Sequence, residues 1–172
     1  GLGAALWIPT AHGAVVLATE AGQPTLAVST ELEMAIVRQM QRELAHVSVE
    51  HALSGPGLMN LYRCLCELRD ATPVHADAGA LVAAAASDPL ARETLETFCG
   101  WLGSFVGDLA IAFGARAVYL AGGVSAHIAP FLPDSPFVAR FLNKGVLASV
   151  LQQSREQLSQ LGFALEPWSM RV

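Results

Sequence analysis

Two glutamates at predicted reversals of the chain are the residues best suited to chemistry. Glu20 follows an apolar segment and precedes Ala-Gly-Gln, and Glu50 lies shortly before the turn sequence Ser54-Gly-Pro-Gly57. An ionised carboxylate accepts at least two hydrogen bonds, and charge-assisted bonds are about twice as strong as neutral ones. This chemistry suits a ligand with neighbouring hydroxyl groups. Either glutamate alone is more typical of a solvated surface carboxylate, so the pair stands as a hypothesis.

Glycines at the ends of predicted strands and helices form a second set of candidates, at positions 1, 3, 22, 55, 57, 122 and 123. Without a side chain, their backbone N–H groups can approach a phosphate or a nucleotide ring. The alternative is that they are ordinary turn glycines. The five histidines are scattered without the spacing of a metal site. Walker A and Gly-x-Ser-x-Gly sequences are absent as well, so we predict neither a metal ligand nor a serine nucleophile.

The N-terminal half of the sequence predicts a hairpin followed by helices. Apolar segments at 4–8 and 14–18, separated by Pro9-Thr-Ala-His-Gly13, are typical of two buried strands. A helix is predicted to begin at Ser29-Thr-Glu-Leu-Glu33, with apolar residues four apart as far as Leu44. Further helices are expected from Ser48, from Gly55 to about Leu68, over 77–86, and from Pro89 to Phe113, where Gly114 ends the last one.

The C-terminal half predicts one more strand and several helices. Residues 117–121 are short, apolar and followed by Gly122-Gly123, which favours a buried parallel strand that ends near a ligand. Helices are expected over 125–132, 136–142 and 145–161, and a closing strand over 163–165. Because strands and helices alternate, the predicted class is α/β.

Composition limits the kinds of protein this can be. The chain has 172 residues, of which 53% are hydrophobic and 15% charged, so a compact domain or lobe is expected. The net charge of −5 argues against a nucleic-acid surface on this segment. Residues 1–19 carry no charged side chain, but Pro9, His12 and Gly13 interrupt them, which argues against a membrane span. The three cysteines indicate no disulfide framework, so the cytoplasm is the expected compartment.

Five motifs in order resemble the C-terminal lobe of bacterial glucokinases. They are Gly1-Leu-Gly3, Glu20-Ala-Gly-Gln23, His46-Val-Ser-Val-Glu50, Leu53-Ser-Gly-Pro-Gly-Leu58 with Asn60-Leu-Tyr62, and Leu120-Ala-Gly-Gly-Val124. The segment 53–63 is the most specific, and the resemblance continues to about Gly145. It implies a ribonuclease H-like, actin-like ATPase lobe, rich in helices, with a mixed sheet flanked by helices. Residues 1–172 would be one domain, the C-terminal large lobe of a two-lobed protein.

The resemblance implies ATP-dependent phosphorylation of glucose, with ATP and Mg²⁺ required. Glu20 and Glu50 match two glutamates that bind sugar hydroxyls, and Gln23 occupies the position of a family histidine, where it cannot carry a proton. Gly1 and Gly3 match the end of a phosphate loop. Gly122 and Gly123 match the adenosine motif.

The same resemblance implies that this chain alone is inactive. The family's N-terminal lobe supplies a phosphate motif and the aspartate that acts as catalytic base, and neither is found here, so no catalytic residue and no metal ligand is assigned to these residues. Phosphoryl transfer depends on positioning and charge neutralisation, which half a cleft cannot provide. An isolated lobe would also expose an apolar face, so a homodimer is expected.

Two alternatives remain open at the level of sequence. The lobe could be the sugar-sensing domain of a transcriptional regulator, a hypothesis that Gln23 motivates. It could also be a structural module that has lost both ligands.

Overall fold

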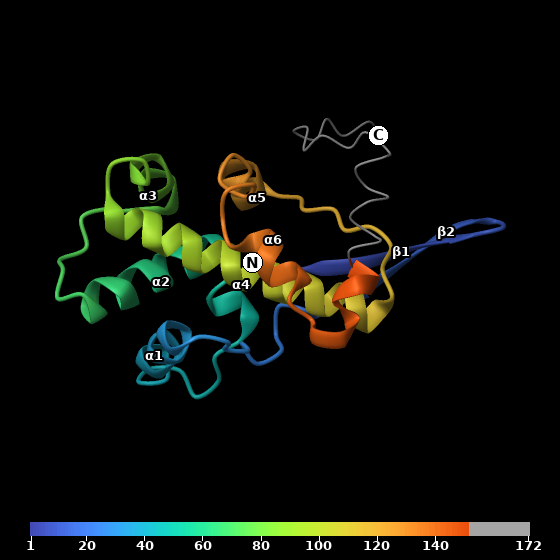
Figure 1. Ribbon diagram of the computed structural model, residues 1–172, viewed down its shortest axis with the longest axis horizontal. Helices are drawn as coiled ribbons and strands as arrows, with labels where there is room; N and C mark the ends of the chain where they lie inside the picture. Colours follow the sequence, from blue (N-terminus) through green and yellow to red (C-terminus); the bar gives the residue numbers. More distant parts are fainter. Residues whose placement is uncertain (152–172) are drawn as a thin grey trace. The chain divides into compact units, whose positions relative to one another are not determined.

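The computed structural model describes residues 1–151 and divides the chain into two compact units, Gly1–Thr94 and Leu95–Val172. The division falls inside the long helix α4 (Pro89–Phe113). Figure 1 shows a helix-rich chain with one small sheet, which confirms the predicted α/β class. The strand expected at 163–165, and the part of the expected helix beyond residue 151, lie outside the described residues.

The sheet of the first unit is a two-stranded antiparallel hairpin. Strand β1 (Ala4–Thr10) pairs with β2 (Gly13–Thr19) in a register that sets Ala4 opposite Thr19. The turn uses Gly13 at φ 126°, a conformation that favours glycine, and the Thr10 hydroxyl donates to the Gly13 carbonyl oxygen at 3.0 Å. The hairpin itself is therefore confirmed as predicted.

The expectation that both strands are buried is wrong in this structure. Trp7 is 67% exposed and Val16 is 64% exposed, and most other residues of β1 and β2 are exposed as well. Two strands form a ribbon with two faces, and among the described residues no third strand pairs with it. An apolar segment indicates that a strand can be buried, but it does not supply the layer of structure that buries it.

Three capped helices contribute to the core of the first unit. They are α1 (Glu31–Met40), α2 (Gly55–Leu68) and α3 (Ala78–Ala84), and the side chains of Thr30, Ser54 and Asp77 accept backbone N–H bonds at their N-termini. Helix α2 contacts both α1 and α3. Its apolar face is almost wholly buried, through Leu58, Leu61, Tyr62 and Leu65. Helix α1 ends at Met40, one turn earlier than the apolar spacing through Leu44 suggests.

The second unit is built on the C-terminal part of α4, with α5 (Gly123–Ile128), α6 (Phe137–Leu142) and the short 3-10 helix η2 (Gly145–Leu147). Its core includes Phe98, Trp101 and Ile128. Helix α4 ends as predicted at Gly114, where φ is 60° and the N–H of Ala115 returns to the carbonyl oxygen of Ala110 at 2.9 Å.

Helices α4 and α6 approach each other closely because α4 carries glycines on the face that meets α6. A Cβ atom on Gly103 would lie 2.2 Å from the carbonyl oxygen of Phe137, and one on Gly107 would lie 2.6 Å from that of Phe141. The Lys144 ammonium then donates to the Ser104 carbonyl oxygen at 2.9 Å and pairs with Asp108 at 2.6 Å. The close approach and these polar contacts fix the C-terminal end of α6 against α4.

The prediction of a strand at residues 117–121 is wrong. The structure assigns irregular backbone there, although Val118 and Leu120 are half-buried while Ala117 and Ala121 are exposed, the alternation typical of a strand. A strand is defined by hydrogen bonds to a neighbour, and the only paired sheet in the described part of the chain is β1–β2.

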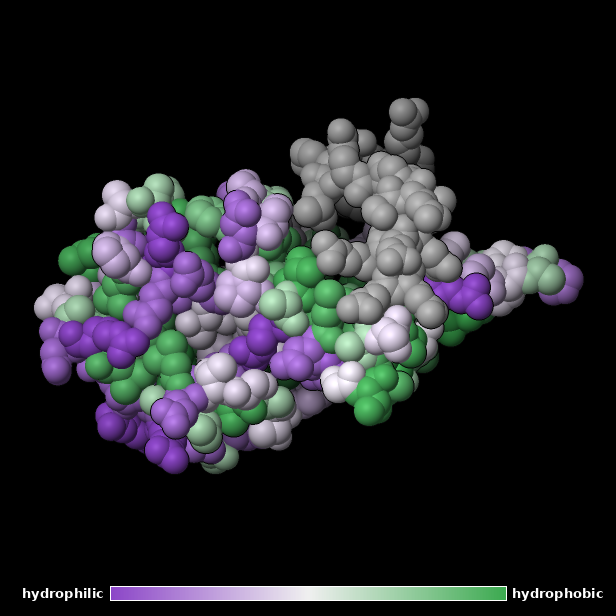
Figure 2. Space-filling view, viewed as in Figure 1, coloured by the Kyte–Doolittle hydropathy of each residue, from purple (hydrophilic) through white to green (hydrophobic). Residues whose placement is uncertain are grey.

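The molecular face shown in Figure 2 mixes hydrophilic and hydrophobic residues. None of the helices within residues 1–151 is long and apolar enough to cross a membrane.

Candidate functional site

The turn that carries Glu20 and Gln23 follows directly from the end of β2. The backbone N–H of Gln23 donates to the Glu20 carbonyl oxygen at 2.9 Å, which closes the turn. The Thr19 hydroxyl donates to the Ala4 carbonyl oxygen at 2.7 Å and thereby ties the start of the turn to β1. Glu20 and Gln23 are exposed, whereas Gly22 between them is buried. The hairpin thus presents two polar side chains from one tight reversal.

Glu50 lies on the short 3-10 helix η1 (Val49–His51), beside this turn. The N–H of Glu50 donates to the Gly22 carbonyl oxygen at 2.9 Å, and the N–H of Val49 donates to that of Pro24 at 2.9 Å. Thr25 and Ser48 form an antiparallel bridge one step further along. Residues 23 to 28 positions apart in the sequence are therefore joined backbone to backbone, and these bonds set the turn that carries Glu20 and Gln23 next to Glu50.

The carboxylate of Glu50 is held by the first residues of the chain. The N–H of Leu2 donates to Oε2 of Glu50 at 2.9 Å. A Cβ atom on Gly1 would lie 3.3 Å from the same oxygen, and one on Gly22 would lie 2.4 Å from the Leu2 carbonyl oxygen. Gly1 and Gly22 leave the space in which Leu2 reaches the carboxylate. One oxygen of Glu50 is thus oriented by the backbone, on a residue that is only half-buried.

The carbonyl group of Glu50 is fixed by the start of α2. The Ser54 hydroxyl donates to the Glu50 carbonyl oxygen at 2.8 Å and accepts the N–H of Gly57 at 2.9 Å. One serine therefore caps α2 and anchors η1. The motif Ser54-Gly-Pro-Gly57, where the sequence predicted that a helix begins, connects Glu50 to the buried helix α2.

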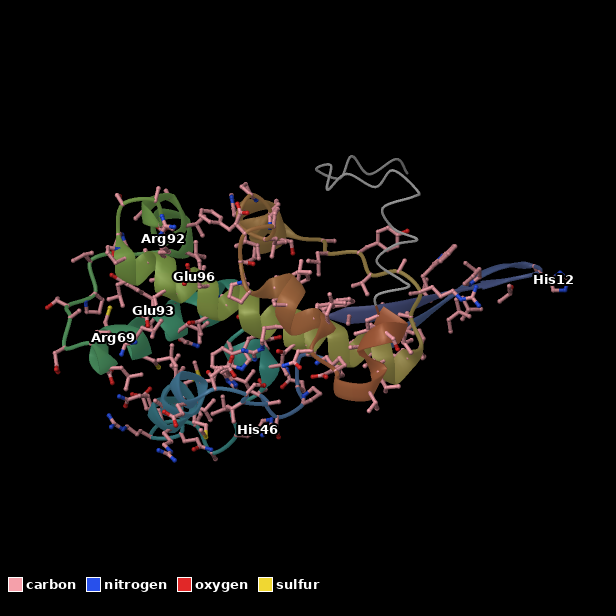
Figure 3. All side chains as sticks on the ribbon, in the orientation of Figure 1. His12, His46, Arg69, Arg92, Glu93 and Glu96 are labelled. Atoms are coloured by element: carbon pink, nitrogen blue, oxygen red, sulfur yellow. The ribbon has the colours of Figure 1, made fainter. Side chains whose placement is uncertain are left out.

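Two histidines that the sequence analysis left without a role support these turns. His46, labelled in Figure 3, makes a 2.9 Å hydrogen bond through Nε2 to the Gln23 carbonyl oxygen. His51 accepts the N–H of Ser48 at Nδ1, at 3.0 Å. Both histidines lie within a few residues of the candidate carboxylate Glu50 in the sequence. This proximity was the available signal, since such a histidine can reach the turn that carries the carboxylate.

The structure brings Gly1, Glu20, Gln23 and Glu50 into one region of the first unit through these bonds, with Gly3 next in sequence to Leu2. Gly122 and Gly123 belong to the second unit, at the N-terminus of α5. Gly122 has φ 106°, and a Cβ atom on Gly3, Gly122 or Gly123 would meet nothing within 4 Å. The backbone at these three glycines is therefore open to approach, as a nucleotide would require.

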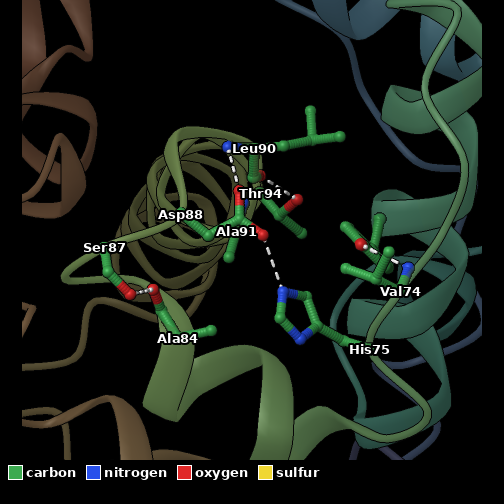
Figure 4. Close-up of polar contacts among 9 residues, drawn as sticks. Val74, His75, Ala84, Ser87, Asp88, Leu90, Ala91 and Thr94 are labelled. Carbon is green, nitrogen blue, oxygen red and sulfur yellow. Dashed lines mark hydrogen bonds and ion pairs between the residues drawn. The ribbon is translucent and has the colours of Figure 1, made fainter.

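Two buried thiols and one capping carboxylate lie outside this region. Burial raises the pKa of the Cys64 and Cys99 thiols to about 11, which leaves them protonated and poor as nucleophiles. Asp88 caps α4 by accepting the N–H of Leu90 at 2.8 Å, and its other oxygen accepts from His75 Nε2 at 2.7 Å (Figure 4). That hydrogen bond lowers the pKa of the Asp88 carboxyl below its usual range. Within residues 1–151, no three His, Cys, Asp or Glu side chains are grouped as a metal site would need.

Comparison with known proteins identifies the family to which this arrangement belongs. The family model described as Glucokinase matches residues 1–155. A glucokinase-like protein of Xylella fastidiosa is 51% identical over 165 residues, covering 94% of this chain and 49% of that protein. A glucokinase of Saccharophagus degradans is 38% identical over 149 residues, covering 85% of this chain and 44% of that protein.

A solved structure gives the same result for the fold. The crystal structure of a glucokinase from an Antarctic psychrotroph superposes with a TM-score of 0.80 at 36% identity, covering 88% of this chain and 48% of that chain. The chain thus spans about half the length of the relatives it matches.

Proposed function

Because the chain belongs to the glucokinase family, we propose that the full-length protein transfers the γ-phosphoryl group of ATP to the 6-hydroxyl group of glucose. In this proposal, the chain is the sugar- and adenosine-binding C-terminal lobe, and residues 1–172 act as one domain. The observation that carries the proposal is the fixed position of Glu50, which is joined to the turn bearing Glu20 and Gln23 by the backbone bond from its own N–H to Gly22.

The sugar is held by side chains of the first unit. Glu20 and Glu50 accept hydrogen bonds from sugar hydroxyl groups, and Gln23 both donates and accepts. The Leu2 N–H occupies Oε2 of Glu50, which directs the other carboxylate oxygen to the sugar. A preset orientation of this kind reduces the ordering that binding must otherwise impose.

The nucleotide is held by open backbone. Gly1 and Gly3 contact the phosphate groups of ATP, and Gly122 and Gly123 let the adenosine lie against the main chain. Within residues 1–151, no three His, Cys, Asp or Glu side chains are grouped to hold a metal ion by themselves. We therefore expect Mg²⁺ to arrive with the phosphates and to keep most of its water ligands.

The chain by itself is expected to be inactive, since the base that removes the proton from the sugar hydroxyl is proposed to lie in the other half of the protein. We further propose that the protein is cytoplasmic, where ATP is available, and that it forms a homodimer. Sedimentation of the full-length protein tests the dimer, and a monomer at micromolar concentration would contradict it. Nothing in the structure or in the relatives favours the alternative of a sugar-sensing regulator.

The test compares Glu50→Gln with the unmodified full-length protein in a coupled assay of ADP release. Glutamine keeps the shape of the side chain and removes the charge, so the hydrogen bonds to sugar weaken. A charged hydrogen bond contributes roughly 1.5–3 kcal/mol, so the KM for glucose should rise roughly tenfold to a hundredfold. Glu43→Gln, on an exposed glutamate outside the proposed site, is the matched control and should leave the KM unchanged.

Two outcomes would contradict the proposal. An unmodified protein that releases no ADP in response to glucose is not a glucokinase, and glucose binding without turnover would favour the sensor instead. Equal glucose KM values for Glu50→Gln and Glu43→Gln would remove the proposed role of Glu50.

A further inference from the structure

The imidazole of His51 closes the turn that carries Glu50. Its Nδ1 lies 3.0 Å from the backbone nitrogen of Ser48 and 2.9 Å from the Ser48 hydroxyl oxygen. The N–H of His51 returns to the Ser48 carbonyl oxygen at 3.1 Å. We propose that His51 is a positioning residue, which orients the Glu50 carboxylate toward the sugar by capping η1. This inference rests on the function proposed above and adds a residue to its sugar site.

The hydrogen bond from Ser48 fixes the tautomer of His51. A backbone N–H can only donate, so Nδ1 must be an acceptor and carry no proton. Nδ1 is therefore the acceptor of the pair, and the Ser48 hydroxyl can donate to it as well. Both contacts depend on an acceptor atom placed one bond beyond Cγ. This requirement on geometry distinguishes a cap from simple packing of a ring.

The cap matters because the internal hydrogen bonds of η1 are weak and the helix depends on bonds from outside itself. A 3-10 helix has poorer hydrogen-bond geometry than an α-helix, and η1 is three residues long. Its internal support is the bond from the N–H of Ala52 to the Val49 carbonyl oxygen at 3.1 Å, close to the bond from the N–H of Leu53 to the same oxygen at 2.8 Å. Ser48 lies directly before η1, and it pairs with Thr25 in the bridge that leads to the turn of Gln23. If Ser48 moves, the backbone position of Glu50 therefore changes with it.

His51 is itself anchored to the buried helix α2. The side-chain amide of Asn60 donates to the His51 carbonyl oxygen at 3.1 Å, and the Ser54 hydroxyl donates to the Glu50 carbonyl oxygen at 2.8 Å. The carbonyl groups of Glu50 and His51 are thus fixed by Ser54 and Asn60 of the α2 segment. With its backbone fixed, the imidazole can hold Ser48 and so close the frame around Glu50 from the other side.

The test uses two substitutions of His51 that differ in one atom of interest. In asparagine, Oδ1 is separated from Cβ by the same two bonds as Nδ1 of histidine, so His51→Asn keeps an acceptor for the Ser48 N–H. His51→Ala removes it. His12→Ala, at the exposed tip of the hairpin in Figure 3, is the control for loss of a histidine. All variants are made in the full-length protein, and the KM for glucose, the KM for ATP and the thermal midpoint are measured.

We expect His51→Ala to raise the KM for glucose roughly fivefold to tenfold, the size of effect known for loss of a cap, while the KM for ATP changes less than about twofold. His51→Asn should restore most of the glucose KM, and His12→Ala should match the unmodified protein. A lower thermal midpoint with an unchanged glucose KM would overturn the inference, as would a His51→Asn variant no better than His51→Ala. If the unmodified protein does not phosphorylate glucose, the proposed function and this inference fall together.

Discussion

Replacing Gly22 with alanine places a methyl group against the backbone that holds Glu50. The new Cβ atom would lie 2.4 Å from the Leu2 carbonyl oxygen, where contacts of 3.4 Å or more are ordinary, so the oxygen must withdraw by about 1 Å. The same Cβ atom would lie 3.3 Å from Oε2 of Glu50. Because the Leu2 backbone and the Glu50 carboxylate both belong to the proposed site, the substitution displaces that carboxylate. It replaces no side chain that is proposed to touch the sugar.

The expected cost has two parts. Overpacking a buried position costs about 1–3 kcal/mol. A 1 Å withdrawal of Leu2 also stretches its 2.9 Å bond to Glu50 beyond the usual limit, and a hydrogen bond to a charged group contributes about 1.5–3 kcal/mol. Since Glu50 is half-exposed and water can replace part of that bond, we expect the free energy of unfolding to fall by about 2–4 kcal/mol. The KM for glucose should rise at least about tenfold.

The assay is glucose-dependent ADP release by the full-length protein, measured alongside urea unfolding. Gly100→Ala is the matched control, because its Cβ atom would meet nothing closer than 3.7 Å. A Gly22→Ala protein with the glucose KM and the unfolding midpoint of the unmodified protein would refute the reasoning. It would show that Leu2 can move aside at no cost and that its bond to Glu50 does not orient the carboxylate.

Two further predictions concern stability in the full-length protein. Gly103→Ala sets a Cβ atom 2.2 Å from the Phe137 carbonyl oxygen and should lower the free energy of unfolding by about 2–4 kcal/mol. Gly100→Ala should be at least as stable as the unmodified protein, because alanine favours helix. Equal urea midpoints for the two variants would contradict this prediction. Asp88→Asn removes the charge beside His75. Because the hydrogen bond from that histidine lowers the pKa of the Asp88 carboxyl, the ionised carboxylate stabilises the folded protein above the usual pKa of an aspartate, and this stability is lost as the pH falls through the lowered pKa. The stability difference between Asp88→Asn and the unmodified protein should therefore be present at pH 6 and vanish in acid, and a difference independent of pH would refute it.

The elements whose stability is local could be predicted from the sequence. The hairpin follows from two apolar segments around Gly13, and α2 follows from the break at Gly55-Pro-Gly57 and apolar residues at helical spacing after it. The end of α4 at Gly114 follows from the freedom of glycine at positive φ. In each case, the residues that decide the structure lie within a few positions of one another.

Features that depend on distant partners could not be predicted in this way. Residues 117–121 have the composition of a strand, but a strand also needs a neighbour, which a single segment cannot specify. The exposure of Trp7 has the same origin, since burial requires a second layer. Helical spacing through Leu44 likewise overran the end of α1 at Met40, because apolar spacing does not encode where a helix stops.

The candidate site divides along the same line. The residue types at Glu20 and Glu50 indicated sugar hydroxyls. The bonds from Leu2 to Glu50 and from Ser48 to His51 are donated by backbone N–H groups, and backbone groups leave no mark in a sequence. The role of Gly22 was visible only as one of seven candidate glycines. What distinguished it was a carbonyl oxygen 2.4 Å from where a side chain would begin.

The bare hairpin also gives the protein an optical probe of its own. Trp7 is 67% exposed, whereas Trp101 is 1% exposed. With Trp101 and Trp168 replaced by phenylalanine, acrylamide should strongly quench the fluorescence of Trp7, because its indole is open to water on the hairpin.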